Sequence, residues 1–196
     1  MSQIAWCGLG WLAWCVLHSL LAGTAVARPL ERLLGVRYRL FYSLFSTLSL
    51  WPVWDATRAL RGAVIWEWSG WFGALQGLLW LAAAALFYLA ARRYDLGRFL
   101  GLLPSEQGMA PDGLDTGGIL AHVRHPWYLA ALLLLWGRDL THIDLVVNGI
   151  LSVYIAAGSA LEERKLARAY GDVYRAYQQR VPMLFPWRSI GTRWRA

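Results

Sequence analysis

Charged residues are scarce in this chain, and their scarcity excludes an ordinary water-soluble domain. Asp, Glu, Lys and Arg make up 16% of the 196 residues, whereas 58% are hydrophobic. A soluble domain of ordinary composition carries about 25% charged residues. The hydrophobic residues also gather in long runs, which a soluble core does not require. We therefore interpret the chain as an integral membrane protein.

Cysteine is rare as well, which removes a disulfide framework from consideration. The two cysteines, Cys7 and Cys15, fall in the same hydrophobic run. On one helix they stand about two turns apart, too far for a disulfide bond. We expect both to be buried thiols that pack like small hydrophobic residues.

Soluble nucleotide-binding folds are excluded by a further absence. No Rossmann fingerprint or phosphate loop occurs together with the alternation of strands and helices that would support it. Any nucleotide-like cofactor must therefore be held by membrane helices and the loops between them.

Long hydrophobic runs are the main feature that is present. A helix needs about 20 residues to cross the hydrocarbon layer. Four runs reach or approach that length, and a fifth is short and predicts a short or tilted helix in a hairpin with the segment after it. The four runs are residues 4–23, 38–60, 69–91 and 145–160, and the short one is residues 126–136.

Basic residues give this arrangement an orientation. With five spans, 16 of the 19 Lys and Arg residues fall on one side of the membrane. The positive-inside rule makes that side the cytoplasm, with the N-terminus outside and the C-terminus cytoplasmic. The net charge of +7 is thus explained by topology, and we expect membrane lipids rather than nucleic acid as the contacts of these cations. The arginine-rich composition suggests a bacterial inner membrane.

The predicted fold is an all-α bundle of five transmembrane helices in a single domain. Its N-terminal part of three helices covers residues 1–91, a cytoplasmic loop covers 92–124, and a helical hairpin with an amphipathic tail helix covers 125–187. The last span begins with a capping-box-like Thr141-His142-Ile143-Asp144 and continues to about Tyr170. Gly171 is the predicted stop, before a short helix over residues 172–180.

Two clusters of ionisable residues are brought together by this hairpin. Arg124-His125-Pro126-Trp127-Tyr128 stands at the start of the short helix, and Glu162-Glu163 stands where the chain returns to the same side. Polar groups near a membrane are costly, so such a cluster is a candidate site by default. Adjacent helical residues point about 100° apart, so only one glutamate is expected to face a pocket fully. The other then pairs with Arg124 or an arginine of the tail.

The chemistry of these side chains fits a nucleotide-like ligand. A carboxylate accepts both hydroxyls of a ribose, while Tyr128, Tyr174 and Tyr177 offer faces for a cation or an adenine. The alternative is a set of ordinary ion pairs at the level of the lipid headgroups. No closed set of metal ligands is present, so we expect no metal site.

The motifs in combination resemble those of a known superfamily. Gly117-x-x-x-x-His122-Val-Arg-His-Pro-Trp-Tyr128, an apolar hairpin, Glu162-Glu163 and the run to Val181-Pro182 are similar to the isoprenylcysteine carboxyl methyltransferase and phospholipid methyltransferase superfamily. The matched region is roughly residues 113–186. The N-terminal half, with His18-Ser19 and Tyr38-Arg39-Leu-Phe-Tyr42, looks most like the bacterial branch that contains methanethiol S-methyltransferases. It also resembles membrane proteins linked to nitrogen-oxide respiration.

This resemblance implies S-adenosylmethionine as the cofactor. It implies cofactor contacts for His122, His125, Pro126, Tyr128, Glu162, Glu163 and Tyr174, with Arg124 near the reacting end. His18 is a candidate base for a thiol substrate, or else a histidine that only bonds to a neighbouring helix. The expected acceptor is a small, methanethiol-like thiol. The alternatives are a prenylcysteine carboxylate, a phospholipid amine, or a non-catalytic accessory role in nitrogen-oxide respiration.

Overall fold

The chain folds into two units of helices, each assembled from three separate stretches. A computed structural model describes residues 2–94, 96–103 and 113–187. The first unit is Met1–Glu67, Asp95–Gln107 and Asp139–Leu151, and the second is Trp68–Tyr94, Gly108–Arg138 and Ser152–Ala196. The longest helix, α7 (His142–Tyr170), contributes its beginning to the first unit and the rest to the second.

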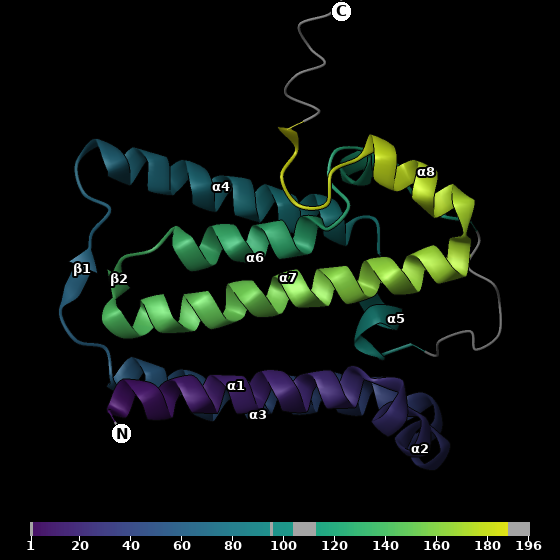
Figure 1. The fold of residues 1–196 in the computed structure, drawn as a ribbon, viewed down its shortest axis with the longest axis horizontal. Coiled ribbons are helices and arrows are strands. Elements are labelled where there is room, and N and C mark those ends of the chain that lie inside the picture. Colours follow the sequence, from purple (N-terminus) through teal and green to yellow (C-terminus); the bar gives the residue numbers. More distant parts are fainter. Residues whose placement is uncertain (1, 95, 104–112, 188–196) are drawn as a thin grey trace, which may run out of the picture. The chain divides into compact units, whose positions relative to one another are not determined.

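The first unit is built on two long helices that run side by side (Figure 1). These are α1 (Gln3–Ala22) and α3 (Tyr38–Ala59). In the sequence they are separated by α2 (Thr24–Leu34) and a turn of 3₁₀ helix, η1 (Gly35–Arg37). A short helix, α5 (Leu96–Leu100), packs on α3. Two short strands, β1 (Val64–Trp66) and β2 (Leu140–Thr141), pair antiparallel with an irregular register.

Several polar groups inside this unit are hydrogen-bonded to one another. Its core gathers Cys7 and Trp11 of α1 with Ile143 and Val147 of α7. The indole N–H of Trp11 donates to the hydroxyl of Thr57 at 2.8 Å, and that hydroxyl donates to the carbonyl of Val53. Burying an unpaired hydroxyl is costly, so this chain of bonds makes a polar residue acceptable in an apolar helix. Both cysteines are buried and unbonded to each other, as expected.

The second unit contains the helical hairpin. It comprises α4 (Trp71–Ala91), the 3₁₀ turn η2 (Gly118–Ala121), α6 (Pro126–Trp136), the later part of α7, and α8 (Asp172–Arg180). Helix α4 runs along α6 (Figure 1). Ala83 and Ala90 of α4 and Ala130 of α6 are fully buried. Such small side chains let two helices approach closely.

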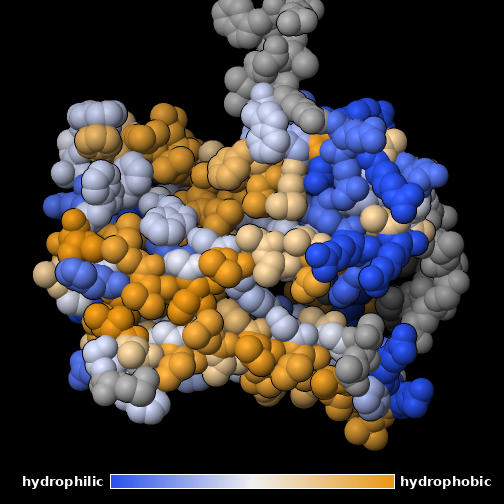
Figure 2. Space-filling view, viewed as in Figure 1, coloured by the Kyte–Doolittle hydropathy of each residue, from blue (hydrophilic) through white to orange (hydrophobic). Residues whose placement is uncertain are grey.

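The outer surfaces of the helices are apolar, as an integral membrane protein requires. Leu48, Leu81 and Val153 are each about 70% exposed on different helices. Contiguous exposed apolar surface of this kind marks a lipid-facing or binding surface. Figure 2 shows hydrophobic surface along α6 and hydrophilic surface over α8. The amphipathic tail helix therefore differs in character from the spans.

Three helices are long and apolar enough to cross a membrane within the described residues. They are α1, α4 and α7. Helix α3 has the length, with 22 residues, but it includes Arg39, Asp55 and Arg58. Helix α6 has 11 residues and measures about 16 Å, half of the hydrocarbon layer. The number of five spans and the orientation of the termini stay predictions.

The predicted ends of α7 are confirmed. At its start, the amide and hydroxyl of Thr141 donate to the Asp144 carboxylate at 2.9 and 2.7 Å, and the Asp144 amide donates back to the Thr141 hydroxyl. This is the reciprocal bonding of a capping box. At its end, Gly171 has a φ of +57°, which glycine adopts without strain, and α8 follows directly.

Two segments differ from the sequence-based expectation. Residues 24–34, where no helix was predicted from the sequence, form the helix α2 despite Pro29 within it. One face of this helix is apolar and the other carries arginines. Leu33, on the apolar face, is 78% exposed. The segment 92–124 contains α5 and η2 rather than continuous loop, and its middle, residues 104–112, lies outside the described residues.

We expect Thr141→Val to destabilise the protein by about 1 kcal/mol, the usual cost of losing an N-cap side chain. The substitution keeps the branched shape in β2 but removes the hydroxyl that closes the capping box. Thermal unfolding in detergent, followed by circular dichroism, measures the change. The exposed neighbour His142, replaced by alanine, is the control. An equal shift in both variants would contradict the capping role.

Candidate functional site

The site begins with a backbone pairing between two distant segments. The amides of Arg124 and His125 donate to the carbonyls of Pro182 and Met183 at 3.0 and 3.1 Å. Pro126 then opens α6, where its missing N–H leaves no bond unmade. The chain after α8 is thereby attached beside the start of α6, and both carry side chains of the site.

Glu163 is the centre of a buried network. It accepts from Arg124 Nε and Nη2, both at 2.9 Å, from Tyr174 Oη at 2.8 Å, and from Gln178 Nε2 at 2.5 Å. His125 Nε2 lies 2.7 Å from the same carboxylate, so this ring nitrogen is the protonated one. The residue is only 7% exposed. A buried carboxylate with this many donors is held as an anion and is fully used.

Arg124 donates hydrogen bonds from all three of its side-chain nitrogens. Besides its two bonds to Glu163, its Nη1 donates to the carbonyls of Gln178 and Val181. Its side chain is 9% exposed. The arginine therefore holds the end of α8 against α7.

Glu162 has a different environment, although it is the adjacent residue. Its side chain is 46% exposed and lines a cavity. Tyr128 Oη donates to its Oε2 at 3.0 Å, and His125 Nδ1 stands 3.7 Å from the same oxygen. One glutamate thus faces the cavity while the other is enclosed, as the helical geometry predicted.

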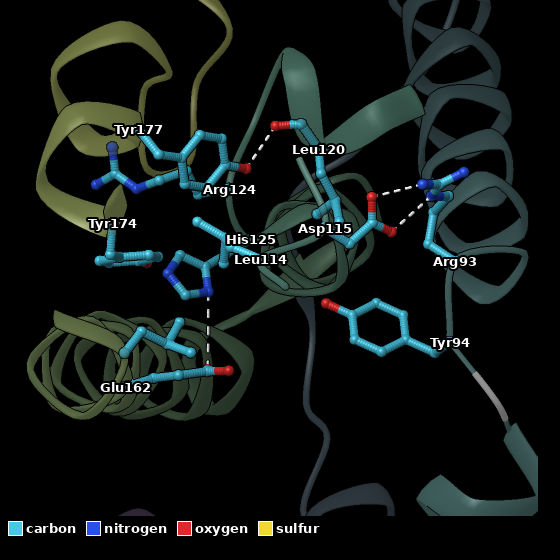
Figure 3. Close-up of a pocket in the computed structure, with 11 residues that line it drawn as sticks. Arg93, Tyr94, Leu114, Asp115, Leu120, Arg124, His125, Glu162, Tyr174 and Tyr177 are labelled. Carbon is cyan, nitrogen blue, oxygen red and sulfur yellow. Dashed lines mark hydrogen bonds and ion pairs between the residues drawn. The ribbon is translucent and has the colours of Figure 1, made fainter. Parts of the chain in front are cut away.

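The cavity has a volume of about 200 Å³. Figure 3 shows its walls, with Tyr174 and Tyr177 of α8 on one side and Tyr94 on another. Three leucines are also among the lining residues. The lining residues, all in the second unit, are Arg93, Tyr94, Leu114, Asp115, Leu120, Arg124, His125, Glu162, Leu166, Tyr174 and Tyr177. Pockets for whole drug-sized ligands measure about 300–1,000 Å³, so this cavity fits part of such a ligand.

Both tyrosines of α8 remain phenols at neutral pH. Burial raises the pKa of Tyr174, and its bond to the Glu163 carboxylate raises that pKa further. Burial raises the pKa of Tyr177 to about 12, and its hydroxyl donates to the carbonyl of Leu120 at 2.5 Å. These hydroxyls fix the positions of η2 and α7 around the cavity, and their rings supply its aromatic wall.

An ion pair borders the cavity on the side of α4. Arg93 Nε and Nη2 donate to the two oxygens of Asp115 at 2.9 and 2.5 Å. Both side chains are partly exposed, at 38% and 43%. The hydrogen bond from Arg93 is the largest cause that lowers the pKa of Asp115 below its ordinary value. Asp115 is therefore a carboxylate at neutral pH.

Most of the predicted site residues come together in the second unit. Arg124, His125, Pro126, Tyr128, Glu162, Glu163 and Tyr174 all lie around the network or the cavity. His122 follows η2 and is exposed, and it does not line the cavity. His18 belongs to the first unit, where its Nε2 lies 2.8 Å from Tyr42 Oη. Its role as a base stays a prediction.

The sequence reasoning missed three participants. Gln178 completes the Glu163 network, and Arg93 with Asp115 forms the ion pair at the cavity. Gln178 stands one helical turn after Tyr174, on the same face of α8, and that spacing could have indicated it. Nothing local links Arg93 to Asp115, which are joined only by the fold. Among the residues that the structure describes, no three His, Cys, Asp or Glu side chains form a metal-binding group.

The fold and site define a helical integral membrane protein with a tyrosine- and carboxylate-lined cavity beside its C-terminal hairpin. A family model described as NnrU protein matches residues 8–183, and the chain belongs to this family. The expected resemblance to the isoprenylcysteine carboxyl methyltransferase superfamily, in the branch of the methanethiol S-methyltransferases, is confirmed by this match and by the relatives below.

Relatives of known name fall into two groups. The chain is 30% identical to methanethiol S-methyltransferase of Crocosphaera subtropica over 82% of its own length and 63% of the relative's. It is 42% identical to methanethiol S-methyltransferase 1 of Bradyrhizobium diazoefficiens, over 40% of the chain and 28% of the relative. It is 25% identical to Nurim of Rattus norvegicus over 91% of the chain and 73% of the relative.

The chain spans less than two thirds of the length of the methanethiol S-methyltransferases that it matches first. No solved structure matches it.

Proposed function

We propose that this protein is an S-adenosylmethionine-dependent methyltransferase that acts on a small thiol. The observation that carries the proposal is the separation of the two glutamates. Glu163 is enclosed by four side chains, whereas Glu162 faces a cavity walled by tyrosines. A buried carboxylate network that only supported the fold would not need a second carboxylate facing an open cavity beside it.

The lining residues match the chemical groups of the cofactor. Its ribose offers two hydroxyls, for which the Glu162 carboxylate is a good acceptor. Its adenine and its sulfonium cation both suit the faces of Tyr94, Tyr174 and Tyr177. When bound, S-adenosylmethionine supplies an activated methyl group attached to a good leaving group. The residues of this chain then bind the cofactor, orient it and exclude water.

Glu163 and Arg124 have a positioning role in this proposal. They join α6, α7 and α8 through one set of charged hydrogen bonds, and so fix the walls of the cavity. This changes the role expected for Arg124, which the resemblance placed near the reacting end. We propose that Tyr128 orients Glu162 through the bond from its hydroxyl, while His125 is held by its Nε2 bond to Glu163.

A small thiol is the proposed acceptor because several relatives are named methanethiol S-methyltransferases. A prenylcysteine carboxylate or a phospholipid amine is the alternative within the same class of reaction. We propose that the cofactor enters from the cytoplasmic side of a bacterial inner membrane, where most of the basic residues are expected.

Two measurements on the purified protein test the function. Calorimetry with S-adenosylhomocysteine, the demethylated product, tests cofactor binding without turnover. Incubation with methyl-labelled cofactor and separate panels of small thiols, prenylcysteine analogues and phospholipids tests the acceptor. The proposal expects binding, and labelling of a volatile thioether. Label found only in the lipid extract would overturn the proposal of a thiol acceptor. Absence of cofactor binding would overturn the proposal of a methyltransferase.

We expect His18→Gln to slow the methylation of a thiol at pH 7 but not at pH 9. The test uses a cysteine-like thiol with a pKa of about 8.5, which is only a few per cent ionised at pH 7, so a base can raise the reactive fraction by at most about 30-fold. At pH 9 the thiol ionises without help. Initial rates at the two pH values measure the effect, and Tyr42→Phe tests whether the bonded tyrosine orients the histidine. An equal loss at both pH values would show a structural role.

A membrane protein that binds the cofactor without transferring methyl groups is the second candidate. It is favoured by the relatives named Nurim, which match up to 91% of the chain under a name that states no reaction. Binding of S-adenosylhomocysteine without labelling of any acceptor panel supports this candidate over the enzyme.

A further inference from the structure

The ion pair between Arg93 and Asp115 is the part of the cavity wall that the proposed function leaves without a role. Arg93 follows the end of α4, and Asp115 precedes η2, with 22 residues between them in the sequence. Figure 3 shows the two side chains directed at one another at the edge of the cavity. Both line the cavity, so any ligand there lies within reach of the pair.

The pair is held loosely compared with the other charged groups of the site. Arg124 has four acceptors and is 9% exposed, whereas Arg93 is 38% exposed and donates to the two oxygens of Asp115. Partly exposed ion pairs contribute little net stability because water and salt screen them. Arg93 can therefore leave Asp115 for the carboxylate of a ligand at little cost in stability. If Arg124 changed its partner in the same way, a buried network would be lost.

We propose that the Arg93–Asp115 pair opens to bind the zwitterionic amino-acid end of the cofactor, with Arg93 taking its carboxylate and Asp115 its ammonium. This inference rests on the proposed function, since it assumes that the ligand carries an α-amino acid. A zwitterion placed between the members of an opened ion pair gives each of them an opposite charge again. Arg93, Asp115 and the two charged groups of the ligand then all have a partner of opposite charge.

The backbone around Asp115 supports its staying in position when Arg93 changes partner. The amide of Gly117 donates to Asp115 Oδ1 at 2.9 Å, which closes a short turn on the aspartate. A Cβ at Gly117 would lie 2.9 Å from Arg93 Nη2, so the guanidinium packs directly against the backbone of this turn. The turn thus fixes Asp115 independently of the ion pair, and the long arginine side chain is the part free to swing.

The position of the pair also complements Glu162. Figure 3 shows Glu162 on α7 and Arg93 beyond the end of α4 bordering the cavity from different sides. If Glu162 binds the ribose of the cofactor, the charged amino-acid end of the cofactor is then placed near Arg93. A cavity of about 200 Å³ does not enclose the whole molecule, so a partly exposed contact at its edge is where such an end fits.

The test compares two ligands that differ only by the amino-acid end. S-adenosylhomocysteine carries it, and 5′-methylthioadenosine lacks it. Calorimetry is done on the purified full chain with the wild type, Arg93→Gln, Asp115→Asn and the control Arg92→Gln. Arg92 is the neighbouring arginine, stands over the ring of Tyr88, and does not line the cavity.

We expect Arg93→Gln to weaken S-adenosylhomocysteine about tenfold or more, the effect of one charged hydrogen-bonding pair, and to leave 5′-methylthioadenosine unchanged. Asp115→Asn should give a smaller loss with the same selectivity, because it removes the ammonium partner but also frees Arg93. Higher ionic strength should weaken S-adenosylhomocysteine more than 5′-methylthioadenosine in the wild type. The Arg92→Gln control should match the wild type with both ligands.

A charge exchange separates this role from a structural one. Arg93→Asp combined with Asp115→Arg can restore an ion pair but reverses the two charges. If the pair only held η2 in place, the double variant would recover both ligands, and that result would overturn the inference. A loss of equal size for both ligands in Arg93→Gln would overturn it too. If the wild type bound neither ligand, the proposed function would fall first.

Discussion

Replacing Glu162 by glutamine is expected to weaken the binding of S-adenosylhomocysteine about a hundredfold while the unfolding temperature stays unchanged. Glu162 is the cavity-facing carboxylate, and its side chain is 46% exposed. Two hydroxyl bonds to a charged acceptor contribute about 1.5–3 kcal/mol each, and part of that is lost to solvent screening at this exposure. About 2.7 kcal/mol remains, which is a hundredfold in affinity.

The stability of this variant should survive because glutamine still accepts the bond from Tyr128. Calorimetry gives the affinity, and circular dichroism in detergent gives the unfolding temperature. Asp172→Asn is the matched control, since Asp172 is an acid of the same unit that is almost fully exposed and bonded to Arg175. A hundredfold loss in the control, or none in Glu162→Gln, would remove Glu162 from the ligand contacts.

Glu163→Ala should have the opposite profile, a large loss of stability. The substitution leaves Arg124 buried without its carboxylate and takes away the common acceptor of His125, Tyr174 and Gln178. Removing one partner of a buried ion pair costs about 3–5 kcal/mol, because the remaining charge is stranded. Unfolding by added denaturing detergent, followed by circular dichroism, measures this change.

Two further variants keep the prediction testable if Glu163→Ala does not fold. Glu163→Gln retains one acceptor oxygen and should lose less. Arg124→Leu combined with Glu163→Leu removes both charges and should be more stable than Glu163→Ala, since no charge is stranded. A Glu163→Ala protein with normal stability and reduced ligand affinity would show instead that Glu163 contacts the ligand directly.

The local features of the fold were predictable because they are encoded by neighbouring residues. The ends of α7 follow from the pattern Thr141 to Asp144 and from Gly171, and the structure confirms both. Helical geometry alone separated Glu162 from Glu163. It could not say which of them faces the cavity, because that depends on Tyr174 and Gln178, which α8 brings to Glu163.

The features that were missed depend on contacts between distant segments. The hydrogen bonds of Arg124 and His125 with Pro182 and Met183 join backbone groups, so no pattern of side chains in the sequence predicts them. The Arg93–Asp115 pair connects residues on two sides of a segment whose middle lies outside the described residues. The helix α2 was missed because its length is far below a span and its composition is mixed.

The attachment of the tail to the start of α6 has a consequence for biosynthesis. The acceptors for Arg124 Nη1 and the partners for the Arg124 and His125 amides come from Gln178 to Met183, which are synthesised after α6 and α7. Until then a growing chain holds a charged guanidinium and two amides that lack their final bonds, next to an apolar hairpin. A polypeptide truncated before α8 therefore cannot assemble the cavity, because it lacks Tyr174, Tyr177 and the two carbonyl acceptors of Arg124 Nη1.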